Sequence, residues 1–237
     1  MNQPTSSVAL YQQRKQSAEF SAGISSEAIH ACFESVLIGQ AASGAVLDWG
    51  AGRGLLTRRL LTLNRFESIT AVDIQSRPSS LDSSIEWIEA DLNQPLNLKP
   101  HCFDVIVSAE VIEHLENPRA TAREWFRLLK PGGLLIFSTP NNESWRALLA
   151  LVMRGHFVDF GDLSYPAHIT ALVRKDITRI LYEAGFTPPQ FSFTNVGKIP
   201  RLPQYRWQRL PFVSLGGLRF SDNLLAITQT SQHASHP

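Results

Sequence analysis

The chain has 237 residues, of which 43% are hydrophobic and 18% charged, and 22 Lys and Arg balance 21 Asp and Glu to a net charge of +1. This mixture is typical of one globular domain, excludes a disordered or fibrous chain, and argues against a surface built wholly to bind nucleic acid. With only Cys32 and Cys102, no signal-peptide pattern and no apolar run long enough to cross a bilayer, the sequence predicts a cytoplasmic protein without a disulfide scaffold.

The predicted elements begin with an N-terminal helical extension over residues 1–44, which holds helices near Val8–Phe20 and Ser26–Gln40. From residue 45, strands alternate with helices, and the helix over 119–129 is expected to stop at Lys130-Pro131-Gly132-Gly133, where Pro and Gly cannot continue it. The strands are expected over 45–49, 68–73, 85–90, 103–108 and 134–138, with helices over 55–63 and 119–129. This alternation predicts an α/β fold with a mostly parallel sheet and helices on both faces.

Beyond residue 140 the pattern loosens, with helices predicted over 145–154 and 175–184 and strands over 186–194 and 223–230. The insertion 195–222 between those strands mixes basic and aromatic side chains, namely Lys198, Arg201, Tyr205, Arg206, Trp207, Arg209, Phe212, Arg219 and Phe220. This mixture is typical of a Pro-broken surface lid, and it also suits peripheral contact with a membrane. Residues 231–237 are expected to be a disordered tail.

The most informative stretch is the glycine turn after the first strand, where Asp48 precedes Gly50, Gly52 and Gly54. Its Gly-x-Gly-x-Gly spacing differs from the dinucleotide fingerprint, and a carboxylate at Asp48 suits an ammonium group and repels a pyrophosphate. Asp73 closes the second strand, where it can accept hydrogen bonds from ribose hydroxyls. Asp91 and Leu92 follow the third strand and can hold an adenine. Together these features describe a site for S-adenosylmethionine.

In these motifs, and in Phe103–Glu110 and Leu129–Ile136, the chain resembles the class I S-adenosylmethionine-dependent methyltransferases over roughly residues 40–230. The resemblance implies a methyltransferase domain over 45–230 with a Rossmann-like, seven-stranded, mostly parallel sheet whose last strand is antiparallel. It implies that the glycine turn and first acid hold the methionine moiety, the second acid the ribose and the third the adenine. The implied cofactor-binding residues are Asp48, Trp49, Gly50, Gly52, Gly54, Asp73, Ile74, Asp91, Leu92 and Ala109.

A second motif, Glu110-Val-Ile-Glu-His114, follows the fourth strand. If the stretch is helical, Glu110, Glu113 and His114 share one face, and two crowded carboxylates require a cation, a proton or a base. The motif resembles ubiquinone-pathway O-methyltransferases and small-RNA 3′-terminal 2′-O-methyltransferases, which use such a cluster plus a later His on a divalent metal. Two interpretations stay open: a Mg²⁺ or Mn²⁺ site of Glu110, Glu113, His114 and His168, or a metal-free site in which His114 is the catalytic base.

The sequence therefore predicts an S-adenosylmethionine-dependent O-methyltransferase that acts on a small molecule, a quinone precursor or a glycan or lipid-linked intermediate. An RNA 2′-O-methyltransferase with a divalent metal is the alternative, weakened by the near-zero net charge, and a NAD-dependent oxidoreductase is a third. The expected partner is a small-molecule or lipid-linked acceptor rather than nucleic acid. Its pocket is expected to form from the N-terminal extension, residues 141–170 and the insertion 195–222.

Overall fold

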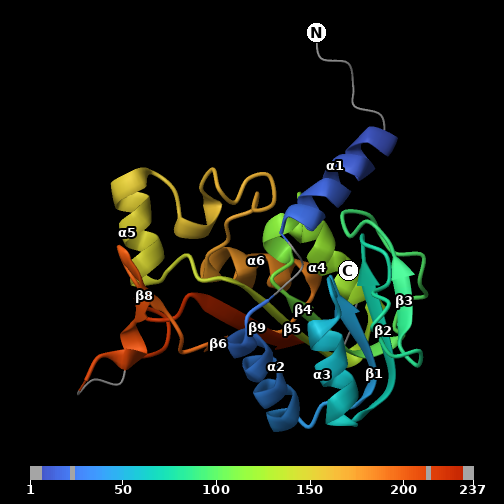
Figure 1. Cartoon of the computed structure of the whole chain (residues 1–237). Coiled ribbons are helices and arrows are strands. Elements are labelled where there is room, and N and C mark those ends of the chain that lie inside the picture. Colours follow the sequence, from blue (N-terminus) through green and yellow to red (C-terminus); the bar gives the residue numbers. More distant parts are fainter. Residues whose placement is uncertain (1–6, 22–24, 212–214, 232–237) are drawn as a thin grey trace.

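A computed structural model of the chain describes residues 7–21, 25–211 and 215–231. Its centre is a seven-stranded sheet in the order β3-β2-β1-β4-β5-β9-β6 (Figure 1). The strands are β1 (Gly44–Trp49), β2 (Phe66–Asp73), β3 (Glu86–Glu89), β4 (Phe103–Ala109), β5 (Leu129–Pro140), β6 (Gln190–Phe193) and β9 (Asn223–Gln229). The first five are parallel, whereas β9 pairs antiparallel with both β5 and β6. The predicted Rossmann-like fold with an antiparallel last strand is confirmed.

Helices cover both faces of the sheet, because alternate side chains of its strands are apolar on each side. In β1, Val46 packs on the face covered by α2 and α3, whereas Leu47 packs on the face covered by α4 and α6. The helices are α1 (Ser7–Phe20), α2 (Glu27–Gly39), α3 (Leu55–Leu63), α4 (Pro118–Leu128), α5 (Trp145–Arg154) and α6 (Arg174–Ala184), with single 3-10 turns η1 (Ile112–His114), η2 (Val158–Phe160) and η3 (Trp207–Arg209). No helix of the described residues is long and apolar enough to cross a membrane.

Two predicted strands have different bounds in the structure. The helix before the Pro-Gly-Gly segment ends as predicted, at Leu128, but the strand predicted over 134–138 already begins at Leu129, so the Pro-Gly-Gly segment lies inside β5. Pairing continues through the segment: Gly132 takes a φ of +76°, and Gly133 exchanges hydrogen bonds with Thr230 after β9 (3.1 and 3.0 Å). The predicted strand 186–194 is reduced to β6 and a single bridge at Phe186.

The insertion 195–222 folds partly as a small hairpin, β7 (Lys198–Ile199) and β8 (Leu202–Arg206), outside the main sheet. Phe212 and residues 232–237 of the predicted tail lie outside the described residues.

The strand order places β1 between β2 and β4, so the connections after these strands leave in opposite directions and open a crevice at their carboxyl ends. α1 stands apart from the sheet in Figure 1 and is tied to this edge by ion pairs. Arg14 pairs with Asp91 at 2.6 Å and with Glu116 at 2.7 Å, and Lys15 pairs with Glu89 at 2.8 Å. The N-terminal helix is therefore placed to form one wall of a site at the crevice.

Candidate functional site

A cavity of about 620 Å³ opens at the carboxyl ends of β1, β2 and β4, a size that suits a small ligand. Its walls come from the sheet edge, from α1, and from the loop between η2 and α6. Eight of the ten predicted cofactor-binding residues line it: Asp48, Gly50, Gly52, Asp73, Ile74, Asp91, Leu92 and Ala109.

The glycine turn forms the floor of the cavity. Gly50 has a φ of +79°, and a Cβ there would collide with Val111, with Cγ1 only 2.8 Å away. Glycine is therefore required both by the backbone and by the close approach of the chain after β4. The Gly52 N–H donates to Asp73 Oδ2 at 2.8 Å, which ties the turn to the end of β2.

Asp48 is a buried carboxylate beside this turn. Its Oδ2 accepts a hydrogen bond from the Thr57 hydroxyl at 2.6 Å. Burial raises the pKa of Asp48 to about 7, the Asp73 charge adds to the rise, and the hydrogen bond from Thr57 opposes it. A cationic ligand group in the cavity would restore the charged form of Asp48.

The other two acids at the crevice also have defined partners. Asp73 accepts from the backbone N–H groups of Gly52 and Gln75, each at 2.8 Å. Asp91 accepts from Arg14 through Oδ2 and from the Asn93 backbone through Oδ1. Each carboxylate oxygen has two acceptor lone pairs, so these contacts orient the groups and leave capacity for a ligand.

Two predicted cofactor-binding residues lie outside the cavity. Trp49 is fully buried in the core, with its ring at right angles to that of Trp125, because alternate side chains of a strand face opposite sides of the sheet. Gly54 precedes α3 with a φ of +73° and packs against Leu81. The structure therefore corrects the prediction that Trp49 and Gly54 line the site.

The Glu-x-x-Glu-His motif adopts a different shape from the predicted helical face. Glu110 has a φ of +57°, and only Ile112–His114 form a helical turn, the 3-10 turn η1. The Glu110 carboxylate therefore turns toward the sheet, where it accepts from Ser138 at 2.8 Å and Asn223 at 2.7 Å. Glu110 is not part of the donor group that the structure assembles from Glu113, His114 and His168.

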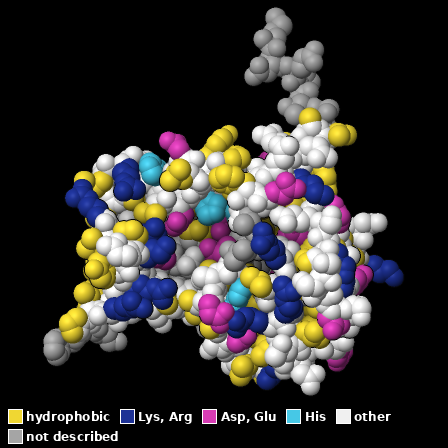
Figure 2. All heavy atoms as spheres, viewed as in Figure 1, with side chains coloured by type: hydrophobic (Ala, Val, Ile, Leu, Met, Phe, Trp, Pro, Cys, Tyr) yellow, Lys and Arg dark blue, Asp and Glu magenta, His cyan; other side chains and the backbone are white. Residues whose placement is uncertain are grey.

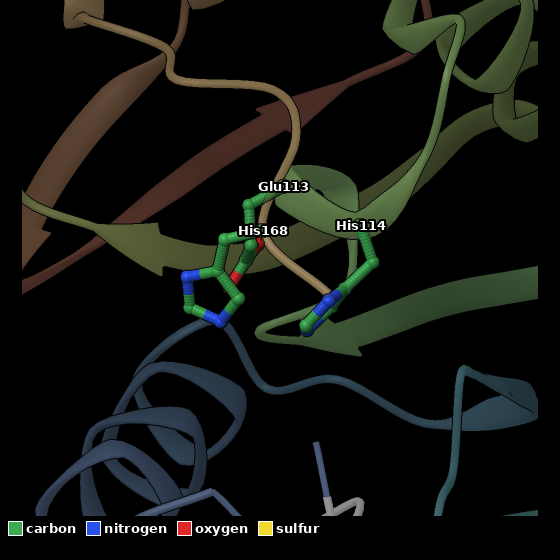
Figure 3. Close-up of side chains that lie close together, drawn as sticks. All are labelled: Glu113, His114 and His168. Carbon is green, nitrogen blue, oxygen red and sulfur yellow. The ribbon is translucent and has the colours of Figure 1, made fainter. Parts of the chain in front are cut away.

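Those three side chains meet although 54 residues separate the two histidines in sequence (168 − 114). One ligand atom from each lies within 4.8 Å of the others. Figure 3 shows Glu113 and His114 projecting from η1 and His168 from the loop that crosses it. The loop is fixed there, since the backbone N–H groups of Ile169 and Thr170 both donate to the Glu113 carbonyl at 2.9 Å.

The cluster contains buried polar atoms that lack a partner within the described residues. Glu113 is fully buried and accepts from Thr139 through Oε2 at 3.2 Å, but its Oε1 has no partner, and neither has Nδ1 of His168. His114 Nδ1 donates to the Ala167 carbonyl at 2.8 Å, so in the neutral ring Nε2 carries the lone pair. Such unsatisfied groups are costly unless a ligand completes them.

The pKa shifts in the cluster have one dominant cause. Burial raises the pKa of Glu113 well above its usual range, and the nearby Glu110 charge adds to this. Burial raises the pKa of Glu110 to about 7, with Asp159 adding. Burial also lowers the pKa of His114 to about 4, helped by the neighbouring His168. Neutral imidazoles beside one carboxyl group are a donor set that a divalent cation can use once the carboxyl group has lost its proton.

The acceptor side of the cavity differs in part from the prediction. Residues of α1 and of the loop 163–169 line it, as expected, but residues of 195–222 do not. The ion pairs that hold α1 at the cavity were not predicted. Their only signal in the sequence is the adjacent pair Arg14 and Lys15, in a helix with one other charge, Glu19.

Replacing Arg14 with Ala should accelerate ligand release. The substitution removes the bridge that holds α1 to Asp91 and Glu116, and a half-buried ion pair of this kind contributes about 1 kcal/mol. We expect S-adenosylhomocysteine to dissociate about fivefold faster in stopped-flow measurements. Arg123→Ala, on an exposed position of α4, is the control and should leave the rate unchanged. An unaltered rate in Arg14→Ala would show that α1 does not retain the ligand.

The matching family model and two curated relatives belong to one class of enzyme, the methyltransferases. A family model described as a methyltransferase domain matches residues 20–190. The ubiquinone biosynthesis O-methyltransferase of Xanthomonas euvesicatoria is 30% identical over 165 residues, which are 60% of this chain and 68% of that protein. The mitochondrial enzyme of the same description from Rattus norvegicus is 32% identical over 118 residues, 45% of this chain and 34% of that protein. The chain thus matches about a third of the rat relative's length.

Solved structures share the fold at lower sequence identity. A SAM-dependent methyltransferase from Archaeoglobus fulgidus is 19% identical with a TM-score of 0.61, and the match covers 90% of this chain and 97% of that one. The 1,6-didemethyltoxoflavin-N1-methyltransferase of Burkholderia thailandensis, solved with S-adenosylhomocysteine, is 15% identical with a TM-score of 0.61 and covers 98% of this chain and 93% of that one.

Proposed function

The chain belongs to the S-adenosylmethionine-dependent methyltransferases, and from this premise we propose that it methylates a hydroxyl group of a small or lipid-linked acceptor of the quinone-precursor kind. The observation that carries this proposal is the cluster of Glu113, His114 and His168 at the cavity. A hydroxyl is a weak nucleophile at neutral pH, so methyl transfer to a hydroxyl requires a base or a metal beside the acceptor. The relatives described as ubiquinone biosynthesis O-methyltransferases support this acceptor class.

We propose that the three acids at the sheet edge bind successive parts of the cofactor, in the order in which they occur in the sequence. Asp48 and the turn at Gly50 and Gly52 fit the methionine end, since a buried carboxylate with a raised pKa gains most from an ammonium partner. Asp73 fits the ribose, and Asp91 with Leu92 fits the adenine.

We further propose that Glu113, His114 and His168 hold a divalent cation such as Mg²⁺ or Mn²⁺. The unpartnered Glu113 Oε1 and the two neutral histidines match such an ion. When bound, the cation lowers the pKa of a coordinated hydroxyl. Ala167 orients His114 through its carbonyl, as the outer partners of metal-binding histidines do. His114 as a lone general base is less suited, because a pKa of about 4 makes it a weak proton acceptor at pH 7.

Calorimetry and a transfer assay test these steps separately. We expect S-adenosylhomocysteine to bind with a dissociation constant in the micromolar range, about −8 kcal/mol, and NAD to give no heat. We expect methyl transfer from S-adenosylmethionine to catechol-containing acceptors, with an amine-bearing analogue of the same ring as the control. Transfer to the amine alone would overturn the proposal of O-methylation, and absence of S-adenosylhomocysteine binding would overturn the assigned cofactor site.

A further inference from the structure

The surface formed by α5 and the β7–β8 hairpin carries large apolar side chains outward. α5 buries only its small residues Ala147 and Ala150. Its large side chains at i, i+4, i+7 and i+8 lie on one exposed stripe, which consists of Trp145, Leu149, Val152 and Met153. Val152 is 81% exposed and Met153 56%. A helix normally buries its large apolar residues, so this one presents the opposite face to its surroundings.

The hairpin is exposed along the whole of β8, and residues that follow it in the chain, Trp207, Arg219 and Phe220, connect it to this helix. The backbone N–H of Trp145 donates to the Arg219 carbonyl at 3.0 Å, and the Arg219 guanidinium lies over the Trp145 ring at 5.2 Å. Phe220, the next residue, packs edge-on against Trp207 after β8. Leu202 and Tyr205 of β8 add further exposed apolar area. The two elements therefore form one continuous surface.

Four exposed arginines lie on or beside these elements. Arg154 ends α5, Arg201 connects β7 to β8, Arg206 ends β8 and Arg209 ends η3. None of these four guanidiniums has an ion-pair or hydrogen-bond partner among the described residues, unlike Arg146 on the same helix, which pairs with Asp222 at 3.6 Å. Figure 2 shows hydrophobic and Lys or Arg side chains gathered on the side where Figure 1 places α5 and β8.

We propose that this surface, defined by α5 and β7–β8, docks the protein on a bilayer that contains anionic lipid. Exposed aliphatic and aromatic side chains enter the headgroup boundary, and flanking arginines gain from the negative surface potential. The surface carries exposed rings at Trp145 and Tyr205, but its most exposed apolar side chains on α5, Val152 and Met153, are aliphatic and offer no flat ring for a base to stack on. This pattern fits a bilayer better than RNA. The inference does not depend on the proposed function, since none of these residues lines the cavity.

Vesicle sedimentation of the full chain tests the proposal. We expect binding to vesicles with 30% phosphatidylglycerol, and little binding to pure phosphatidylcholine. Val152→Glu/Met153→Glu should weaken binding at least about tenfold. Ile38→Glu, at an aliphatic residue of α2 whose exposure of 52% is close to the 56% of Met153, is the control and should bind like the wild type. Arg201→Gln/Arg206→Gln/Arg209→Gln should weaken binding about 100-fold, since each arginine near an anionic surface contributes about fivefold. Arg123→Gln/Lys175→Gln/Arg179→Gln is the charge-matched control.

S-adenosylhomocysteine affinity and the thermal midpoint of each variant report its folding, so a loss of vesicle binding in an unfolded variant is recognised. Absence of wild-type binding to anionic vesicles would overturn the proposal. So would equal weakening by the α2 control. Two further outcomes would also overturn it: a concentration-dependent dimer that Val152→Glu/Met153→Glu dissociates, which would assign the face to a second copy, or RNA that displaces the protein from vesicles through the same arginines.

Discussion

Replacing Asp48 with Asn should weaken S-adenosylmethionine binding by about 10- to 100-fold at pH 8, because a charge-assisted hydrogen bond contributes about 1.5–3 kcal/mol. Asn preserves the shape of the side chain, and its carbonyl oxygen can still accept from the Thr57 hydroxyl. The loss therefore reports the charge that faces the cationic end of the cofactor. Calorimetric titration with S-adenosylhomocysteine, which has the same amino group, measures it.

The same substitution should stabilise the ligand-free protein at high pH. The folded pKa of Asp48 is raised from 3.8 to about 7, so between those values the native state holds a proton that the unfolded chain releases. The contribution of Asp48 to stability is thus complete below about pH 4 and is lost as the pH rises through 7. At pH 8 we expect Asp48→Asn to be more stable than the wild type by about 2–4 kcal/mol, with the difference vanishing near pH 4.

Denaturant unfolding at pH 4.5 and 8 checks this stability difference, and comparing two proteins cancels the titration of their shared carboxyls. Asp82→Asn, an exposed acid outside the cavity, is the control and should not weaken ligand binding. Weaker binding without the gain in stability would mean that the pKa of Asp48 is not raised in the free protein. A gain in stability with unchanged affinity would place the cofactor's ammonium group elsewhere.

The fold and the cofactor side of the site could be predicted because their signals are local. Gly50 and Gly52, Asp73 and Asp91 follow successive strands, and the carboxyl ends of parallel strands meet at one edge. Trp49 was assigned to the site wrongly, since it follows Asp48 in a strand and must face the opposite side of the sheet. Side chains alternate between the two faces of a strand, so the same pattern that indicates β1 also places the Trp49 side chain away from that of Asp48.

The acceptor side could not be predicted in the same way, because it depends on the backbone and on long-range contacts. We expected Glu110, Glu113 and His114 to share one face of a helix. Glu110 does not share it, because its positive φ directs its carboxylate to β5 and β9. His168 joins the cluster only because its loop is hydrogen-bonded to the Glu113 carbonyl. Arg14 and Asp91 are 77 residues apart, so the adjacent cations Arg14 and Lys15 do not reveal their partners in the sequence.

Glu113→Gln and His168→Ala should each reduce methyl transfer at least 100-fold and abolish Mn²⁺ binding. Glu113 offers a buried, unpartnered oxygen, and the amide of Gln has no charge with which to hold a divalent cation. Chelator should inactivate the wild type, and Mg²⁺ or Mn²⁺ should restore it. Neither substitution touches the glycine turn, so S-adenosylhomocysteine affinity should change less than about threefold, which is below 1 kcal/mol.

His156→Ala is the matched control, because His156 precedes η2 in the same region, and within the described residues its ring makes one hydrogen bond, to the Phe157 carbonyl at 2.8 Å. It should retain both metal binding and transfer. The alternative, a metal-free site with His114 as base, predicts a different set of results: chelator leaves the rate intact, only His114→Ala is severe, and the rate rises with pH through the imidazole pKa. Mn²⁺ titration by calorimetry decides between them without an acceptor, since the free protein presents Glu113, His114 and His168 within 4.8 Å.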